Sequence, residues 1–318
     1  MLTLNLALPP LRRLVADAAI AQGALARWCA RGDRLPDAPA GRSVWTRELF
    51  QFAGTSVPVA ALTRDIDAAD ATGFAWLRAD PAHVRADMST ARMLACGDMG
   101  LTPAECQELL QPLKPLFGDS GFPIDSPVPS RWYLRAPAGA MLPTFATPDD
   151  VLGDDLKRHL PDGAQGRRWR SLLSEAQIIL HNHPVNAARA ERGAMPVNSL
   201  WFWGAGTLPE WVKSSLTRAL SNDPSVIALA NRAKVAHGTP GSLESSLSDL
   251  SRTERALLDL DDASGLADLN SRWLPAIDQL LAKRKLAELR LLFASGERYA
   301  IRPSQRWRFW RRVVPLSA

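Results

Sequence analysis

The sequence of 318 residues has few of the side chains that build disulfides or Cys/His metal sites. It contains five histidines and three cysteines, and Cys29, Cys96 and Cys106 form no CxxC or CxxH pair. Three thiols cannot all pair with one another, so a reduced protein with small, buried cysteines is expected. A disulfide framework and a cysteine-based zinc site are therefore not predicted.

The sequence also lacks a long apolar run. No stretch approaches the roughly 18 consecutive apolar residues of a membrane-spanning helix. Arg12, Arg13 and Asp17 interrupt the order of residues that a secretory signal peptide needs. We therefore expect a cytoplasmic protein without a membrane partner. The net charge of +5 permits an anionic ligand without demanding nucleic acid.

Short apolar strands alternate with helices along the chain. Alternation over Leu2–Leu8 predicts a strand that ends at Pro9-Pro10, and Leu11–Arg31 carries apolar residues at helical spacing. Ser295-Gly296, between two apolar runs, predicts a β-hairpin. Further strands are expected at 58–62, 73–79, 130–136 and 199–204. Further helices are expected within 102–117, where Pro112 and Pro115 should end or kink the helix, and at 147–161, 166–183 and 271–293. This order predicts a mixed α/β protein with an α+β layer in its middle.

Residues 181–206, HNHPVNAARAERGAMPVNSLWFWGAG, bring histidine, asparagine, arginine and tryptophan side chains close together in the sequence. One hypothesis is a site: Asn186, Arg189 and Asn198, helped by His183, could converge on a phosphate or carboxylate. The other is a joint, in which His183-Pro184 ends a helix and the asparagine amides fix the turns. Both hypotheses stay open from the sequence.

Two further groups of residues have a structural and a functional interpretation. Trp201 and Trp203 share one face of a strand and Phe202 takes the other, which indicates a buried strand or a base-stacking platform. Surface ion pairs are expected among Asp70, Asp80, Asp87, Arg78 and Arg85. Near the C-terminus, arginines interleave with aromatic residues and could bind nucleic acid, or stay solvated while the rings pack on the core: Arg302, Arg306, Trp307, Arg308, Trp310, Arg311 and Arg312.

The span 181–206 resembles a signature of archaeal-type, cofactor-independent phosphoglycerate mutases. The matching residues are His183-Pro184-Val185-Asn186, Arg189, Gly193, Pro196, Asn198-Ser199, Trp201, Trp203, Gly204 and Gly206. With TPDDVLG at 147–153, the likeness extends over roughly 73–206, which corresponds to an inserted domain in that family. It implies a reduced alkaline-phosphatase-like core, made of an N-terminal segment 1–72 and a C-terminal helical segment and basic tail 207–318, around an insert domain 73–206.

The whole-chain layout also resembles a bacterial group called regulatory protein RpfE. The likeness lies in ARGDRLPDA, WLRADPAHVRADM and the closing WRFWRR. This resemblance implies a regulatory role.

The chain departs from the mutase pattern where the family binds metal. Those enzymes hold two divalent metals with Asp and His, because both oxygens of a phosphoryl transfer must be neutralised. Here the first strand ends in Pro9-Pro10 where the family has Asp-Gly, His237 is the single histidine after residue 206, and there is no Asp-His pair. No catalytic residue, metal or cofactor is therefore predicted.

The resulting prediction is a cytoplasmic pseudoenzyme that binds a phosphorylated or carboxylated metabolite or a protein partner. The alternatives are a metal-dependent phosphoglycerate mutase or phosphatase with non-standard ligands, and a nucleic-acid-associated regulator that uses the Arg/Trp-rich C-terminus.

Overall fold

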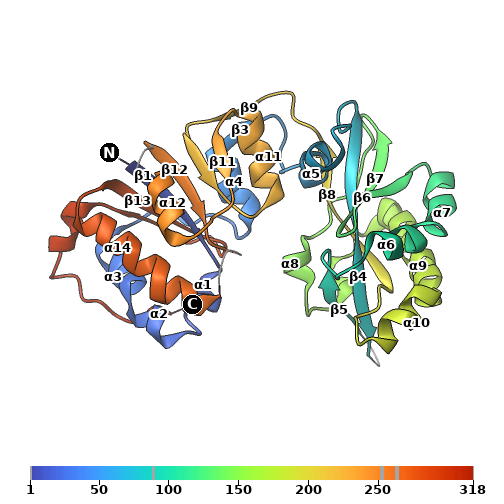
Figure 1. The fold of residues 1–318 in the computed structure, drawn as a ribbon, viewed down its shortest axis with the longest axis horizontal. Coiled ribbons are helices and arrows are strands. Elements are labelled where there is room, and N and C mark those ends of the chain that lie inside the picture. The colour runs from blue at the N-terminus through green and yellow to red at the C-terminus, as the bar shows by residue number, and fades with distance from the viewer. Residues whose placement is uncertain (1, 88–89, 251–253, 262–264, 318) are drawn as a thin grey trace. The chain divides into compact units, whose positions relative to one another are not determined.

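The computed structural model describes residues 2–87, 90–250, 254–261 and 265–317 (Figure 1). They form two compact units. The terminal unit consists of Met1–Thr55 and Glu210–Ala318, and the middle unit of Ser56–Pro209. The mixed α/β class expected from the sequence is confirmed. The expected insert at 73–206 lies within the middle unit.

A seven-stranded sheet forms the centre of the terminal unit. The strand order is β11 (Ala236–Gly238), β10 (Arg218–Leu220), β12 (Arg255–Asp259), β1 (Leu2–Leu8), β13 (Leu286–Phe293), β14 (Arg298–Ile301) and β2 (Asp33–Arg34). The first five strands pair in parallel, and the pairings of β13 with β14 and of β14 with β2 are antiparallel. A separate pair joins β3 (Phe50–Phe52) to β9 (Val212–Ser214). The parallel strands bring their carboxyl ends to one edge of the sheet.

Eight α-helices accompany this sheet in the described part of the terminal unit: α1 (Leu11–Leu14), α2 (Ala18–Gln22), α3 (Ala24–Arg31), α4 (Arg42–Leu49), α11 (Pro224–Arg232), α12 (Leu243–Leu250), α13 (Leu266–Asp268) and α14 (Leu274–Ala282). A π-helical turn, η2 (Leu269–Trp273), precedes α14, and a 3₁₀ turn, η3 (Pro303–Trp307), follows β14. Helices α3 and α14 lie side by side (Figure 1), joined by a hydrogen bond of 2.7 Å from the Trp28 indole to Asp278.

Two long helices expected from the sequence are interrupted in this unit. The expected helix over Leu11–Arg31 is three short helices, because Asp17 caps the start of α2 and Gly23 separates α2 from α3. The expected helix over 271–293 ends at Ala282, and Arg284 takes a left-handed φ of 55°. The following apolar run is β13, whose neighbours on the two sides are β1 and β14.

The middle unit contains an antiparallel sheet with β4 (Phe74–Ala86) at its centre. One edge of β4 pairs with β8 (Ser199–Thr207), and the other pairs first with β7 (Arg131–Pro137) and then with β5 (Ala91–Cys96). Strand β6 (Ile124–Val128) lies beyond β7. The expected strand at 199–204 is therefore confirmed, but it is an edge strand among the described residues.

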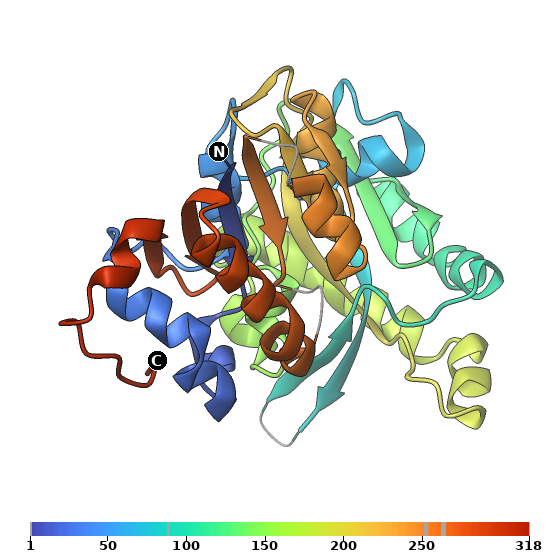
Figure 2. The same cartoon turned by 60° about the vertical axis from the view of Figure 1, so that its left-hand side comes forward.

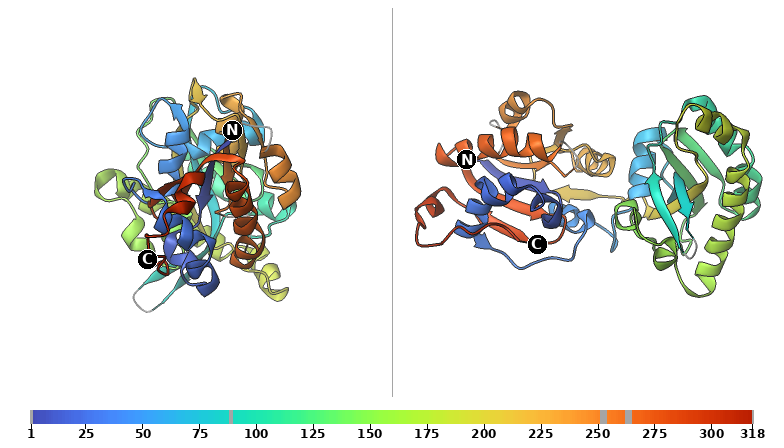
Figure 3. Two further views of the ribbon diagram at one scale, coloured as in Figure 1. Left: turned by 90° about the vertical axis from the view of Figure 1, so that its left-hand side faces the viewer. Right: turned by 90° about the horizontal axis from the view of Figure 1, so that it is seen from below.

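Helices cover both faces of this sheet. On one face α5 (Val59–Ala68) packs on Trp76 and Tyr133. The other face carries the larger core, in which the Trp169 and Phe202 rings lie 5.1 Å apart. The remaining elements are α6 (Pro103–Leu110), α7 (Leu113–Asp119), α8 (Pro148–Val151), η1 (Leu156–His159), α9 (Gly163–His181) and α10 (Pro184–Glu191). Figure 3 shows α9, in yellow-green, alongside the strands of this unit.

One expected strand of the middle unit is a helix. The run 58–62 was expected as a strand, but Pro58 precedes the first residue of α5. Ala60, Ala61 and Leu62 are all fully buried, so the apolar run covers the sheet instead of joining it. By contrast, the capping box of Thr102 and Glu105 at the start of α6 is present as expected.

The cysteines are free, as the sequence indicates. Burial raises the pKa of Cys29 to about 12 and that of Cys96 well above its usual range. Because the thiolate is the reactive form, these thiols are poor nucleophiles in the folded chain.

None of the helices in the described residues is long and apolar enough to cross a membrane.

Candidate functional site

The span 181–206 forms a joint between α9, α10 and β8. His183 is the N-cap of α10, and its ring Nδ1 accepts a hydrogen bond from the Val185 amide at 3.3 Å. The Asn186 amide group donates to the carbonyls of Leu180 and Val197, at 2.7 and 2.8 Å. Asn186 Oδ1 accepts from the Val197 amide at 2.8 Å. Buried Asn186 thus ties the end of α9 to the segment that leads into β8.

Arg189 is fully buried and bonded to protein on every side of its guanidinium. Nε donates to the Met195 carbonyl at 3.0 Å and Nη2 to the Met99 carbonyl at 2.6 Å. Nη1 faces Glu105, with 3.4 Å between Nη1 and Oε2. An anion at this place would have to displace Glu105 or a backbone carbonyl.

Asn198 binds the backbone of β4. Its Oδ1 accepts from the Val84 amide and its Nδ2 donates to the Val84 carbonyl, both at 2.8 Å. The side chain thus makes the pair of bonds that a strand would make and extends the pairing of β8 with β4. Together, His183, Asn186, Arg189 and Asn198 hold backbone segments rather than surround a cavity.

The glycines at the end of β8 allow α5 to approach. Gly204 has a φ of 67°, and a Cβ on Gly206, whose φ is 157°, would lie 2.5 Å from Pro58 Cβ. A side chain at Gly206 would therefore push α5 off the strand. The backbone here packs on a helix, which explains the glycines without a ligand.

Glu105 links the joint to α6 and gives the fold a dependence on acid pH. Burial raises the pKa of its carboxyl, but hydrogen bonds from Thr102 and Arg192 and the charge of Arg189 outweigh burial and lower this pKa to about 2. A carboxyl whose pKa is lower in the folded than in the unfolded chain stabilises the fold above its unfolded pKa. That stabilisation is lost as the pH falls through the folded pKa.

We therefore expect the free energy of unfolding of the wild type to fall between pH 4.5 and about pH 2 more steeply than that of Glu105→Gln. Urea denaturation at a series of pH values measures both slopes. Equal slopes would show that Glu105 is not the titrating group.

Arg78 and Asp80 form a buried ion pair, so the expectation of surface ion pairs is wrong for these two residues. Their exposed fractions are 5% and 2%, and two hydrogen bonds of 2.8 Å join them because both lie on the face of β4 beneath α5. The Trp203 indole donates to Asp80 at 2.7 Å, and the Arg78 guanidinium lies 5.3 Å from the Trp203 and Tyr133 rings. Trp203 is therefore a packing residue beside a satisfied charge, not a stacking platform.

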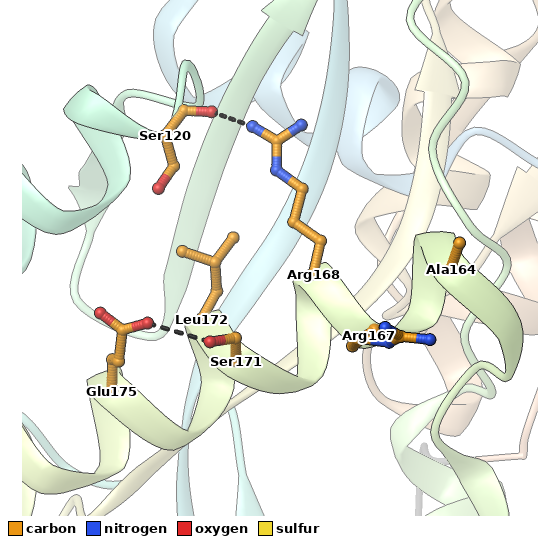
Figure 4. Close-up of a pocket in the computed structure, with 7 residues that line it drawn as sticks. All are labelled: Ser120, Ala164, Arg167, Arg168, Ser171, Leu172 and Glu175. Atoms are coloured by element: carbon orange, nitrogen blue, oxygen red, sulfur yellow. Dashed lines mark hydrogen bonds between the residues drawn. The ribbon is translucent and has the colours of Figure 1, made fainter.

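A shallow hollow of about 470 Å³ lies over α9 (Figure 4). Its polar groups pair within the protein: Arg168 donates to the Ser120 carbonyl and lies 4.7 Å from the Phe122 ring, and Ser171 donates to Glu175 at 3.1 Å. Charges of both signs line it. The hollow contains none of the residues that the sequence singled out.

A denser polar group lies at the carboxyl ends of β10 and β12 in the terminal unit. Asp259 is the last residue of β12, and the Ser221 hydroxyl, just after β10, donates to it at 2.7 Å. Asp223 caps α11 by accepting from the Ser225 amide at 2.8 Å. Ligands of open α/β sheets bind at such carboxyl ends.

The centre of this group is Arg42, the first residue of α4. Its Nη2 lies 2.7 Å from Asp259 and 3.4 Å from Asp223, and its Nη1 lies 2.6 Å from Asp261. Gly41, with a φ of 117°, makes the turn that starts α4 at this point. We call Arg42, Asp223, Asp259 and Asp261 the arginine-carboxylate cluster. None of these four residues was predicted from the sequence to belong to a site.

Burial shapes the electrostatics of the cluster. The Asp259 side chain is 2% exposed and that of Arg42 is 17% exposed. Burial raises the pKa of the Asp259 carboxyl and the neighbouring Asp223 adds to the rise, whereas Arg42 and the Ser221 hydroxyl oppose it. A buried carboxylate needs a cation or hydrogen bonds close by, and Arg42 is the cation that this structure supplies.

The C-terminal segment 302–317 also belongs to the terminal unit. Arg308 pairs with Asp33, and Arg302 pairs with Glu288 and lies near Asp33. Arg311 donates to the Gly32 carbonyl and Arg306 to the Ala282 carbonyl. Trp307 and Trp310 are 61% and 69% exposed, so these rings do not pack into the core.

Comparison with known proteins finds sequence similarity to one group of enzymes over part of the chain. No family model matches the chain. A probable 2,3-bisphosphoglycerate-independent phosphoglycerate mutase of Geobacter sulfurreducens is 32% identical over 109 residues, which cover 34% of this chain and 27% of that protein. The corresponding enzyme of Methanosarcina barkeri is 39% identical over 64 residues, or 20% and 16% of the two chains. Part of this chain is similar to cofactor-independent phosphoglycerate mutases.

The aligned residues span about a quarter or less of the length of these relatives. Among solved structures, a cofactor-independent phosphoglycerate mutase from Thermoplasma acidophilum aligns with 95% of this chain and 89% of its own, at 16% identity and a TM-score of 0.42. The PH0037 protein from Pyrococcus horikoshii aligns with 95% and 88%, at 13% identity and a TM-score of 0.43.

The residues of the terminal unit do not fit the dinuclear metal centre that the mutase resemblance implies. The three carboxylates at the carboxyl edge already surround a guanidinium. His237 is the one histidine of this unit, and its Nδ1 lies 2.9 Å from the Val235 carbonyl. Over the described ranges, no group of three or more His, Cys, Asp or Glu side chains is arranged to hold a metal ion.

Proposed function

We propose that the protein is a non-catalytic, phosphoglycerate-mutase-like protein that acts by binding an anionic metabolite or a protein partner. In this proposal the terminal unit is a reduced alkaline-phosphatase-like core and the middle unit its insert. The regulatory role implied by the resemblance to the RpfE group belongs to the same proposal. One observation carries it: Arg42 occupies the centre of the carboxylates at the carboxyl edge of the sheet.

The chemistry of arginine supports this proposal. Phosphoryl transfer in two-metal enzymes needs dications that bind the attacking and the leaving oxygens together. A guanidinium is a permanent single charge without an open coordination position. With Asp259 and Asp261 hydrogen-bonded to Arg42, the cluster holds carboxylate oxygens that already have a partner instead of presenting free ligand atoms to a metal.

An assay of phosphoryl chemistry tests the proposal. The purified chain is incubated with 3-phosphoglycerate or p-nitrophenyl phosphate and with Mg²⁺, Mn²⁺, Co²⁺ or Zn²⁺, beside a phosphoglycerate mutase as positive control. We expect no turnover above a metal-only blank. Metal-dependent turnover that is lost in Asp259→Asn would instead support the alternative, a mutase or phosphatase with non-standard ligands.

Metabolite binding at the joint has a separate test. Calorimetry with 3-phosphoglycerate at millimolar concentration measures whether Arg189 and Asn198 admit an anion despite their protein partners. Saturable heat that Asn198→Ala abolishes would place the metabolite there. An absence of heat would leave the joint as architecture, and binding would then rest on a protein partner or on nucleic acid.

A further inference from the structure

The C-terminal segment exposes three large aromatic rings within four residues. Trp307 is 61% exposed, Phe309 77% and Trp310 69%. Exposed aromatic groups at this density mark interaction surfaces, because folded monomers rarely leave contiguous apolar patches in water. We call Arg306, Trp307, Phe309, Trp310 and Arg312 the Arg/Trp surface.

The segment that carries these rings is held in place by its own arginines. Arg308 donates to Asp33 at 2.5 Å and to the Arg31 carbonyl at 3.1 Å, and Arg311 donates to the Gly32 carbonyl at 2.6 Å. The Leu316 amide donates to the Ala21 carbonyl at 2.9 Å. Figure 2 shows the red C-terminal segment beside the blue N-terminal helices. The rings are therefore presented by an anchored segment, which lowers the entropy cost of binding.

The arginines thus fall into two groups. Arg308 and Arg311 bind the residues at the end of α3, whereas Arg312 is exposed beside the rings and exposed Arg306 keeps one hydrogen bond of 3.3 Å to the Ala282 carbonyl. The Arg306 guanidinium lies 4.8 Å from the centre of the Trp307 ring. The Phe309 and Trp310 rings meet edge to face, with 5.5 Å between their centres and 78° between their planes.

A surface that mixes exposed aromatic rings with arginines fits unstacked nucleic-acid bases better than it fits a lipid surface. Helices that lie on a membrane separate an apolar face from a charged one, but here a guanidinium lies on a ring and the residues after Trp307 are not helical. Single-stranded bases stack on aromatic faces while arginines bind the phosphates. In a duplex the bases stack on one another and offer no free face to the rings.

We propose that the Arg/Trp surface binds single-stranded nucleic acid without sequence preference, by base stacking on Trp307 and Trp310 and phosphate contacts from Arg306 and Arg312. This function does not depend on whether the carboxyl edge is catalytic, so the two proposals fail separately.

Fluorescence anisotropy of a labelled oligouridylate, titrated with the full chain at low and at physiological ionic strength, tests this inference. Replacing both Trp307 and Trp310 with alanine should weaken binding by about tenfold or more, since each base-aromatic stack contributes to affinity. Arg312→Gln should reduce the salt dependence of binding. Trp211→Ala is the matched control, because Trp211 is an exposed indole elsewhere in the terminal unit, 46% exposed and 5.5 Å from Lys213.

The wild type, the double variant and the control are also titrated with a duplex of the same length and with vesicles that contain phosphatidylserine. Strong binding of the single strand, lost in the double variant and kept in Trp211→Ala, is the expected result. No binding of the oligouridylate, binding that the double variant retains, or equal binding of the duplex would overturn the inference. Binding of the vesicles alone would assign the surface to a membrane.

Discussion

Arg42→Ala lowers the free energy of unfolding by about 3–5 kcal/mol if the arginine-carboxylate cluster is a structural ion network, because removal of one partner leaves buried charges uncompensated. Asp259, at 2% exposure, then has no guanidinium within reach of its carboxylate. Chemical denaturation, read by tryptophan fluorescence and by circular dichroism, measures the change.

Two further variants separate this effect from the general loss of an arginine. Arg34→Ala removes an exposed pair, with side chains of Arg34 and Asp37 exposed by 60% and 51%, and should leave the free energy of unfolding nearly unchanged. Arg42→Ala combined with Asp259→Asn should recover part of the loss, since the amide removes the uncompensated charge. A loss in Arg42→Ala no larger than in Arg34→Ala would contradict the structural role of the cluster.

Arg189→Met, in the middle unit, should lower the free energy of unfolding about as much as Arg42→Ala does. Methionine keeps the apolar stem but leaves the carbonyls of Met99 and Met195 and the Glu105 carboxylate without their buried donor. Each buried acceptor left unpaired costs about 1–3 kcal/mol, and a charged one costs more. We expect a loss of several kcal/mol in the free energy of unfolding, measured in the same way.

Arg192→Met is the control for this prediction. Arg192 pairs with the same Glu105 from the same helix region, but its side chain is 50% exposed. Its loss should cost less than about 1 kcal/mol. If Arg189→Met were equally mild and abolished binding of 3-phosphoglycerate, the joint would be a ligand site after all.

The parts of the fold that could be predicted from the sequence are those that neighbouring residues determine. The capping box of Thr102 and Glu105, the end of α9 before His183-Pro184, and the hairpin around Gly296 follow from side chains within a few positions of one another. The mixed α/β class follows from the order of such elements. In each case the side chains within a few positions of the element were enough to predict it.

The candidate site could not be found in this way, because its contacts join distant parts of the chain. Arg42 meets Asp259 across 217 positions, and Arg189 meets Met99 across 90. Arg189 lies near two asparagines in the sequence, which suggested an anion site. In the structure its guanidinium instead binds backbone carbonyls that only the folded chain brings close to it. One signal was present: the apolar strand β12 ends in Asp259, and Asp261 follows two residues later, at the edge where parallel strands present polar groups.

The most direct test of a carboxyl edge whose oxygens are occupied by a guanidinium is the metal content of the purified wild-type chain. The protein is equilibrated with Mn²⁺ and Zn²⁺, passed through a desalting column and measured by elemental analysis, beside a phosphoglycerate mutase treated in the same way. We expect no stoichiometric metal in this chain and bound metal in the control enzyme. About two equivalents of metal per chain, lost in Asp259→Asn, would contradict it.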